Sequence, residues 1–240
     1  MNVLIIGEPK RADELMQKLP IENLKIEHFI QFGGSYLSKY DVIFDLNFDD
    51  NWQSLKYFAT LQKTPIFVGA VKKQLAQVIH EYPNQMNCRL IGMNTLPTFI
   101  NRPKLEFSVF MEKDVEKRID LIAEQFGWEY TLVEDRVGMV TPRIIFMIIN
   151  EACFTLQEGT ATAEDIDKAM KLGTNYPHGP FEWADKVGIK EVYETLKAIH
   201  EDTGDERYRV CPLLRTKYLK NEPFYLKETK NEEAGSEVSA

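Results

Sequence analysis

Short runs of apolar residues alternate with stretches of helical periodicity along the first half of the chain. Apolar runs of this length, bounded by glycine or polar residues, are typical of strands buried in a parallel sheet. The runs lie at residues 2–6, 24–30, 41–46, 64–68, 89–92, 105–110 and 130–133, and the helical stretches at residues 11–19, 53–62, 72–80 and 114–126. This alternation predicts βαβ units in a parallel sheet.

The periodicity changes at Thr141, which is followed by a proline. We expect Thr141 to cap a helix and Pro142 to occupy its first position, where the missing N–H has no cost. Apolar residues then recur at helical spacing as far as Leu156, and Gly159 ends the pattern. The sequence therefore predicts one long amphipathic helix at this point.

Further helical signals follow the long helix. Thr162 imitates the start of a capping box and Gly173 closes that segment, while residues 180–188 and 190–202 supply two more helical stretches. The second half is therefore predicted to be all-α. We expect an α/β domain over residues 1–135, a helical domain over residues 136–226, and a disordered tail over residues 227–240, which are polar and lack aromatic side chains.

The chain has a formal net charge of −8 over 240 residues. This acidic balance disfavours a nucleic-acid partner, because phosphate backbones are bound by clustered Lys and Arg. No apolar run approaches the length of a membrane span, and the N-terminus lacks the pattern of a signal peptide, so we expect a soluble, cytoplasmic protein. The three cysteines are widely spaced without a CxxC pattern, which predicts structural thiols and no metal site.

The stretch from Gly138 to Arg215 carries the most specific pattern in the chain. It contains GMVTPRIIFMIINEA, then EGTATAEDIDKAMKLGTNYPHGPFEWADKVGI, then TGDERYRVCPLLR. These segments resemble the C-terminal domain of the 3-hydroxyacyl-CoA dehydrogenases. The resemblance implies a shortened Rossmann-like domain followed by a helical domain of that type. It also implies a homodimer formed through the helical domain, and an acyl-CoA ligand.

In this family a glycine-rich turn after the first strand binds the pyrophosphate of NAD. The corresponding segment here is IIGEPKRADEL, in which Gly7 remains as the only candidate cofactor-binding residue. Pro9 has no N–H to donate, and larger side chains replace the next two glycines. Residues 29–33 contain no carboxylate to accept the ribose hydroxyls. We therefore expect no cofactor to bind in the usual mode, and NAD only if the enzyme is active.

The family's catalytic segment has the form GxHFFNPxxxxxLxE, which aligns without gaps with GMNTLPTFINRPKLE at residues 92–106. By this resemblance Glu106 occupies the position of the orienting carboxylate, and Asn94 occupies the position of the histidine base. An amide does not take up a proton at neutral pH. Gly69 stands at the position of the family's substrate-contacting serine, and Pro142 at that of an active-site asparagine.

Two lysines are candidates for substrate binding. Lys72 and Lys73 follow Gly69 in the segment where the family contacts substrate, so they are candidates to face an acyl-CoA phosphate, although lysines at a helix start are more often solvated. His178 and the other histidines have no motif partner and are expected at the surface or in packing. Asp45 is expected to cap the end of its strand.

Three functional hypotheses remain. The first is a divergent member of the 3-hydroxyacyl-CoA dehydrogenase family, an oxidoreductase family of fatty-acid metabolism, with weak or absent NAD-dependent hydride transfer. The second is an active 3-hydroxyacyl-CoA or 3-hydroxybutyryl-CoA dehydrogenase with a rearranged site. The third is a non-catalytic partner that regulates or scaffolds an intact paralogue. The sequence does not choose the ligand, the partner or the pathway.

Overall fold

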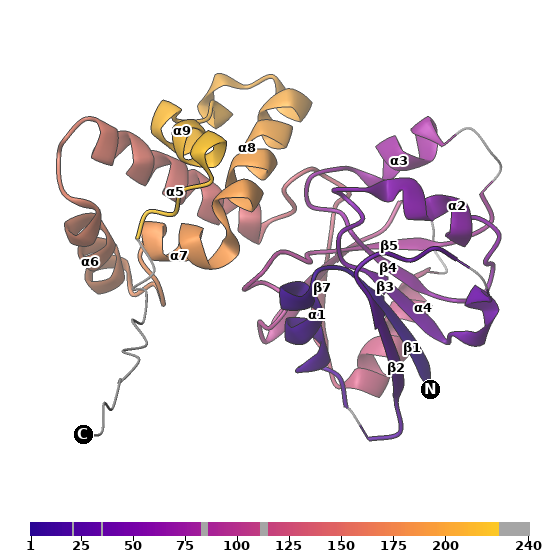
Figure 1. The fold of residues 1–240 in the computed structure, drawn as a ribbon. Coiled ribbons are helices and arrows are strands. Elements are labelled where there is room, and N and C mark those ends of the chain that lie inside the picture. Colours follow the sequence, from indigo (N-terminus) through magenta and orange to yellow (C-terminus); the bar gives the residue numbers. More distant parts are fainter. Residues whose placement is uncertain (21, 35, 83–85, 111–114, 226–240) are drawn as a thin grey trace, which may run out of the picture.

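The computed structural model describes residues 1–225 apart from 21, 35, 83–85 and 111–114, so the expected tail at residues 227–240 lies outside the described residues. Within the described part, seven strands form one sheet in the order β2-β1-β3-β4-β5-β6-β7 (Figure 1). The strands are β1 Asn2–Ile6, β2 Lys25–Phe29, β3 Val42–Asp45, β4 Ile66–Gly69, β5 Leu90–Met93, β6 Lys104–Ser108 and β7 Glu129–Val133.

The predicted parallel sheet is confirmed, with one exception at β6. All other neighbouring strands pair in parallel, whereas β5 and β6 pair antiparallel. Because β6 runs the other way, its first residues lie at the edge where β5 ends. The N–H of Asn94, just after β5, donates to the backbone oxygen of Glu106 at 3.2 Å. The reversed strand thus brings the two ends of the segment at residues 92–106 together.

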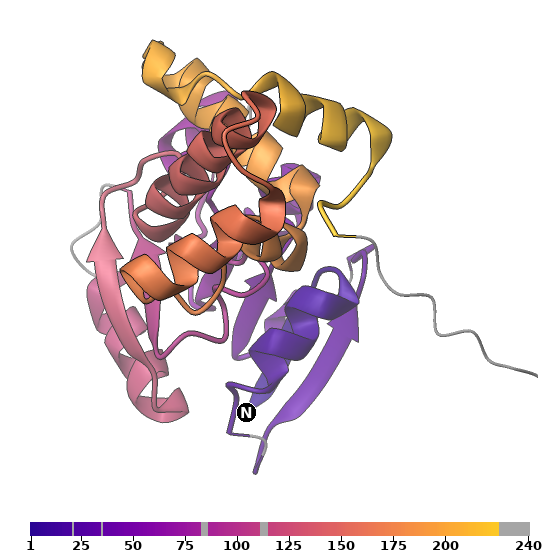
Figure 2. The ribbon, with the colours of Figure 1, turned by 90° about the vertical axis from the view of Figure 1, so that its left-hand side faces the viewer.

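Helices cover both faces of the sheet. The helices α1 Pro9–Met16 and α4 Val115–Phe126 lie on one face, and α2 Leu55–Phe58 and α3 Leu75–Glu81 lie on the other (Figures 1 and 2). Side chains alternate along a strand, so Val3 and Ile5 join the apolar cluster on the face covered by α1 and α4. Leu4 and Ile6 join the cluster on the face covered by α2 and α3. Both faces are buried, which explains the continuous apolar runs in the sequence.

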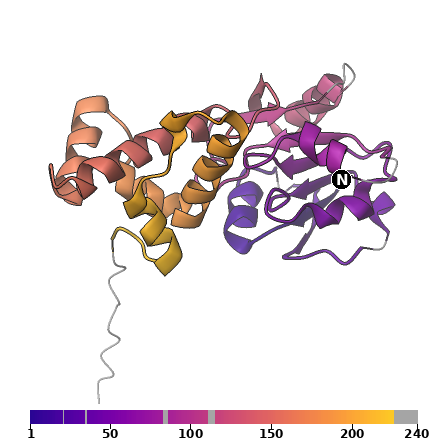
Figure 3. The same cartoon turned by 90° about the horizontal axis from the view of Figure 1, so that it is seen from above.

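The predicted all-α second half is also confirmed. Its helices are α5 Thr141–Gln157, α6 Ala163–Thr174, α7 Pro180–Val187, α8 Ile189–Thr203 and α9 Pro212–Lys220, and α5 contacts each of the others. They gather at one side of the sheet (Figure 3), and one apolar cluster continues from Leu4 in β1 to Leu214 in α9. The two parts therefore share a core at their junction, and the expected boundaries at residues 135 and 226 stay a prediction.

Several local expectations were wrong. The residue before α5 is Val140, and the first turn is capped by a carboxylate from another element, because the N–H of Thr141 donates to Glu106 Oε1 at 2.9 Å. Gly173 lies inside α6, which ends at a left-handed Asn175. The expected helix at residues 53–62 is a short 3-10 turn followed by the four-residue α2. Helix α9 was not predicted.

The loop between α6 and α7 is held by one buried carboxylate. Asp167 accepts hydrogen bonds from the N–H of Phe181 at 2.8 Å and from that of Glu182 at 2.9 Å, which satisfies the first turn of α7. A Cβ at Gly179 would lie 2.2 Å from Asp167 Cγ, so only glycine fits there. The family-like sequence of this loop therefore serves helix geometry. Within the described ranges, no helix has the length and apolar character that crossing a membrane requires.

Candidate functional site at the carboxyl edge of the sheet

The turn after β1 is filled by side chains of this chain. A Cβ at Gly7 would lie 2.8 Å from Asn47 Oδ1 and 2.9 Å from Leu46 Cβ, so the glycine permits the loop after β3 to pack closely. The N–H of Glu8 donates to Asn47 Oδ1 at 2.9 Å, and Pro9 has no N–H. Two backbone groups that would otherwise point at an anion are thus unavailable.

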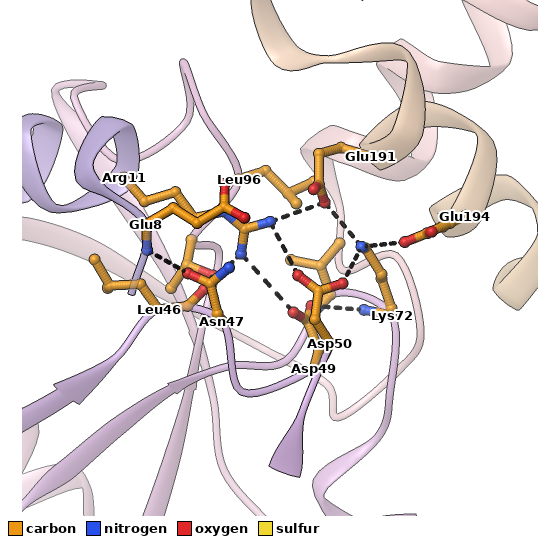
Figure 4. Close-up of polar contacts among 12 residues, drawn as sticks. Glu8, Arg11, Leu46, Asn47, Asp49, Asp50, Lys72, Leu96, Glu191 and Glu194 are labelled. Atoms are coloured by element: carbon orange, nitrogen blue, oxygen red, sulfur yellow. Dashed lines mark hydrogen bonds and ion pairs between the residues drawn. The ribbon is translucent and has the colours of Figure 1, made fainter. Parts of the chain in front are cut away.

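Arg11 turns inward from α1 and is 1% exposed. Its guanidinium donates to the backbone oxygen of Leu46 at 2.5 Å, and Nη2 lies 2.9 Å from Glu191 Oε2 and 3.5 Å from Asp50 Oδ2 (Figure 4). Burial lowers the pKa of Arg11, but the carboxylates of Glu191, Asp49 and Asp50 outweigh it and hold that pKa above its ordinary value. Arg11 is therefore committed to carboxylates of its own chain.

Lys72 belongs to the same group of charges, which we call the Arg11–Lys72 cluster: Arg11, Asp49, Asp50, Lys72, Glu191 and Glu194. Its Nζ lies 2.6 Å from Asp50, 2.7 Å from Glu194 and 2.9 Å from Glu191. Burial lowers the pKa of Lys72, and the surrounding carboxylates reverse this and raise it. Lys72 is buried, so the expectation of a solvated lysine was wrong, and its ammonium faces its own chain. Lys73 is half-buried.

The cluster joins the sheet to the helical part. Arg11 comes from α1, Asp49 and Asp50 from the loop after β3, and Lys72 from the loop after β4, while Glu191 and Glu194 come from α8 (Figure 4). Asp49 Oδ2 also accepts from the N–H groups of Val71 and Lys72, each at 3.1 Å. Sequence reasoning missed the cluster, because its partners are far apart and charged residues are usually solvated.

A cavity of about 300 Å³ opens beside the ends of β1 and β3, where a dinucleotide would lie in a Rossmann-like fold. Its charged lining consists of Glu8, Asp45 and Asp50 against the single cation Lys56. Asp45 is buried and accepts from Ser54 Oγ at 2.6 Å, yet burial raises the pKa of its carboxyl group to about 7. This acidic lining does not fit a pyrophosphate. The turn after β1 does not fit one either, because the N–H of Glu8 is already bound to Asn47 and Pro9 has no N–H.

Asn94 and Glu106 meet, as the resemblance implied for their positions. Asn94 is 3% exposed, and its Nδ2 lies 3.3 Å from Glu106 Oε2 and 3.4 Å from Thr141 Oγ1. With Glu106 Oε1 bound to the N–H of Thr141, the carboxylate ties β6 to the start of α5. A cavity of about 340 Å³ lies beside these three residues, with Phe99 and Arg102 also in its wall.

Gly69 is explained by packing. A Cβ there would lie 2.6 Å from Thr95 Oγ1, which itself donates to the backbone oxygen of Leu46 at 2.8 Å. A larger residue would displace this buried hydroxyl. Pro142 is buried at the start of α5 and contributes no amide. Within the described residues, no three His, Cys, Asp or Glu side chains are grouped so as to hold a metal ion.

The fold and these residues define a class: a protein with a Rossmann-like sheet joined to a helical part, with its candidate site where the two meet. The family model of the 3-hydroxyacyl-CoA dehydrogenase C-terminal domain matches residues 138–229. Residues 138–229 thus match the C-terminal domain of the 3-hydroxyacyl-CoA dehydrogenase family.

Two curated relatives illustrate the similarity. The chain is 37% identical over 134 residues to a probable 3-hydroxybutyryl-CoA dehydrogenase of Bacillus subtilis, covering 55% of this chain and 46% of the relative. It is 43% identical over 96 residues to the 3-hydroxyadipyl-CoA dehydrogenase of Escherichia coli, covering 40% of this chain and 20% of that protein. The matches thus span about half of the first relative's length and a fifth of the second's.

Solved structures share the fold. An (S)-3-hydroxybutyryl-CoA dehydrogenase from Ralstonia eutropha superposes with a TM-score of 0.74 at 18% identity, covering 95% of this chain and 99% of the other. FadB2 from M. tuberculosis superposes with a TM-score of 0.72 at 16% identity, covering 94% and 98%. At these identities the likeness concerns the fold alone.

Proposed function

We propose that this protein is a divergent member of the 3-hydroxyacyl-CoA dehydrogenase family with weak or absent NAD-dependent hydride transfer. The observation that carries the proposal is the position of Arg11. In the turn where a dinucleotide-binding protein presents glycines to pyrophosphate, this chain buries a guanidinium and surrounds it with Asp49, Asp50 and Glu191. An incoming pyrophosphate would meet these carboxylates without free backbone donors from Glu8 or Pro9.

The residues at the catalytic positions support the same proposal. Asn94 carries an amide, which does not act as a base, and Glu106 uses one carboxylate oxygen to cap α5. The Asn94–Glu106 pair thus has a structural role in joining β6 to α5. We assign no substrate contact to Lys72, because three carboxylates already surround its ammonium, and Lys73 remains the candidate for an acyl-CoA phosphate.

The test is an assay of acetoacetyl-CoA reduction at 340 nm, with NADH binding measured by fluorescence titration. Restoring a histidine base in an otherwise intact site contributes roughly 10²–10⁴-fold. We nevertheless expect no turnover from wild type or from Asn94→His, and no saturable NADH binding in the micromolar range. Turnover by wild type contradicts the proposal. Turnover by Asn94→His alone would mean that cofactor and substrate bind and that only the base is missing.

The alternative is an active 3-hydroxyacyl-CoA or 3-hydroxybutyryl-CoA dehydrogenase that uses NAD in a rearranged site. The relatives' names favour it, and so does the retained contact of Asn94 with Glu106. The same assay decides between the two. A regulatory or scaffolding partner of an intact paralogue is the third candidate, and it predicts that a mixed dimer forms with such a paralogue. In each case we place the protein in acyl-CoA metabolism.

We also propose a homodimer formed through the helical part. Ile144 on α5 is 55% exposed, and with Met147, Ile148 and Tyr208 it lines an open, largely apolar hollow of about 470 Å³. An amphipathic helix that leaves such a stripe uncovered is suited to a self-complementary interface around a two-fold axis.

A further inference from the structure

A further cavity, of about 450 Å³, lies between α1, the loop from β5 to β6, and α7. Its lining contains three cationic side chains, Lys10, Arg102 and Lys186, and no Asp or Glu. This composition is unexpected in a chain with a net charge of −8. It is also the reverse of the cavity at the ends of β1 and β3, where three carboxylates face one lysine.

Arg102 is the central group of this cavity. Its guanidinium carbon lies 4.2 Å from the centre of the Phe99 ring and 5.3 Å from that of Trp183, and Nε donates to the Thr98 backbone oxygen at 3.3 Å. Among the described residues no carboxylate forms an ion pair with it. Burial lowers the pKa of Arg102, and the more distant charge of Glu106 only partly opposes this effect. At Arg11, by contrast, the neighbouring carboxylates outweigh the effect of burial and raise the pKa.

The loop that carries Arg102 is held in a costly conformation. Thr98 has a φ of 71°, which a β-branched residue rarely adopts. Its N–H donates to both carboxylate oxygens of Glu14, at 2.9 and 2.8 Å, and its hydroxyl accepts from Trp183 Nε1 at 3.3 Å. The strained turn, the tryptophan and the arginine thus form one preorganised wall.

Arg102 also connects this cavity to the candidate catalytic position. It lines both the 450 Å³ cavity and the 340 Å³ cavity that contains Asn94, Glu106 and Thr141. A group bound at Arg102 would therefore lie next to those residues. On the other side of the cavity, Lys186 is exposed, and its ammonium lies 3.9 Å from the nearest carboxylate, that of Glu182. The same carboxylate is closer to His178 Nδ1, at 3.0 Å.

We propose that this cavity binds an oxyanion, a carboxylate or phosphate group of a small molecule, with Arg102 as the principal donor and Lys186 and Lys10 as flanking charges. A planar guanidinium packed against two aromatic rings presents its free N–H groups in a fixed fork, which suits either anion. Lys10 is held at the edge of the cavity, because its ammonium donates to the Lys186 backbone oxygen at 2.5 Å. This site goes beyond the proposed function, since it requires neither NAD nor hydride transfer.

Isothermal titration of the full chain with glutarate, pyrophosphate and uncharged glutaramide at constant ionic strength tests the proposal. We expect saturable one-to-one binding of an anion and none of glutaramide. Binding of glutarate alone assigns a carboxylate, and binding of pyrophosphate alone assigns a phosphate. The result does not depend on NADH binding, so failure here is distinct from failure of the proposed loss of hydride transfer.

Variants locate the site. Arg102→Gln is expected to weaken binding by about tenfold or more, because it removes a charge-assisted donor. Lys186→Gln removes an exposed charge without disturbing the aromatic packing and is expected to weaken binding severalfold. Arg118→Gln, a distant arginine that donates to backbone oxygens of Gln62 and Lys63, is the matched control and should leave affinity unchanged. The proposal is overturned if neither anion binds, if glutaramide binds equally well, or if both cavity variants bind as wild type does.

Discussion

The carboxylate of Asp167 in α6 accepts a hydrogen bond from the backbone N–H of Phe181 in α7 at 2.8 Å, and the Cα and Cβ of Asp167 leave no room for a side chain at Gly179. A Cβ at that glycine would lie 2.3 Å from Asp167 Cβ and 2.5 Å from its Cα. Because one of these atoms belongs to the backbone, a rotation of the Asp167 side chain cannot relieve the clash. The packing of α6 against α7 is therefore sensitive to a single methyl group.

We expect Gly179→Ala to lower the free energy of unfolding by about 2 kcal/mol or more, as other overpacked sites do. Gly173→Ala is the matched control, because a Cβ there meets nothing within 4 Å and alanine is favoured over glycine in a helix by up to about 1 kcal/mol. Urea denaturation followed by circular dichroism measures both. Equal midpoints for the two variants would contradict this account of the loop.

Glu191 neutralises two buried cations, with Oε2 at 2.9 Å from both Arg11 and Lys72. Glu191→Gln should therefore destabilise the protein by about 3 kcal/mol, because removing one partner from a buried ion pair leaves uncompensated charge. Glu201→Gln, which breaks only the exposed pair with Lys197, should cost about 0.5 kcal/mol or less. Chemical denaturation gives both values, and a similar small loss for each would argue against a structural role for the cluster.

The dimer proposal predicts that a charge at the exposed position of α5 prevents association. Ile144→Glu should give a monomer by light scattering at concentrations where wild type is a dimer, because an unpaired carboxylate is costly to bury. Leu121→Glu changes another exposed aliphatic residue, on α4, and should remain a dimer. A wild-type monomer, or a dimeric Ile144→Glu, would rule out this interface.

The buried carboxyl group of Asp45 should make the free energy of unfolding depend on pH. Its pKa is raised from 3.8 to about 7 by burial, so between about pH 4 and pH 7 the folded state holds a proton that the unfolded chain releases. The contribution of Asp45 to stability is therefore largest at low pH and is lost as the pH rises through 7. Asp45→Asn should gain stability relative to wild type between pH 5 and pH 8. Asp13→Asn, at an exposed position, is the control for the loss of one carboxyl group. A difference between Asp45→Asn and wild type that does not vary with pH would refute the effect.

Local pattern predicted the sheet and most helices because buried parallel strands are continuous apolar runs and helices repeat every 3.6 residues. It did not predict the antiparallel β6, since strand direction depends on how the loop at residues 94–103 turns back. The capping of α5 was also beyond local reasoning. Thr141 looks like a cap in sequence, whereas the group that accepts its N–H is Glu106, on another strand.

The candidate site was predictable only in part. Asn94 and Glu106 were placed by the resemblance, and the structure brings them into contact at 3.3 Å. Arg11, Asp49 and Glu191 carried no local signal, because a charged residue is by default solvated and its partner lies up to 180 positions away. The burial of Lys72 was not predicted for the same reason. The contacts of Arg102 with Phe99 and Trp183 were not predicted either, because Trp183 lies in α7, far along the chain from Arg102.

The Arg11–Lys72 cluster also constrains the history of this sequence. A substitution of Arg11 by glycine, as a dinucleotide turn would need, leaves Asp49, Asp50 and Glu191 with one neighbouring cation fewer. A substitution of Glu191 first removes the carboxylate closest to Arg11. Each single step passes through a less stable intermediate. A glycine-rich turn at this position would thus require concerted changes in three separate segments.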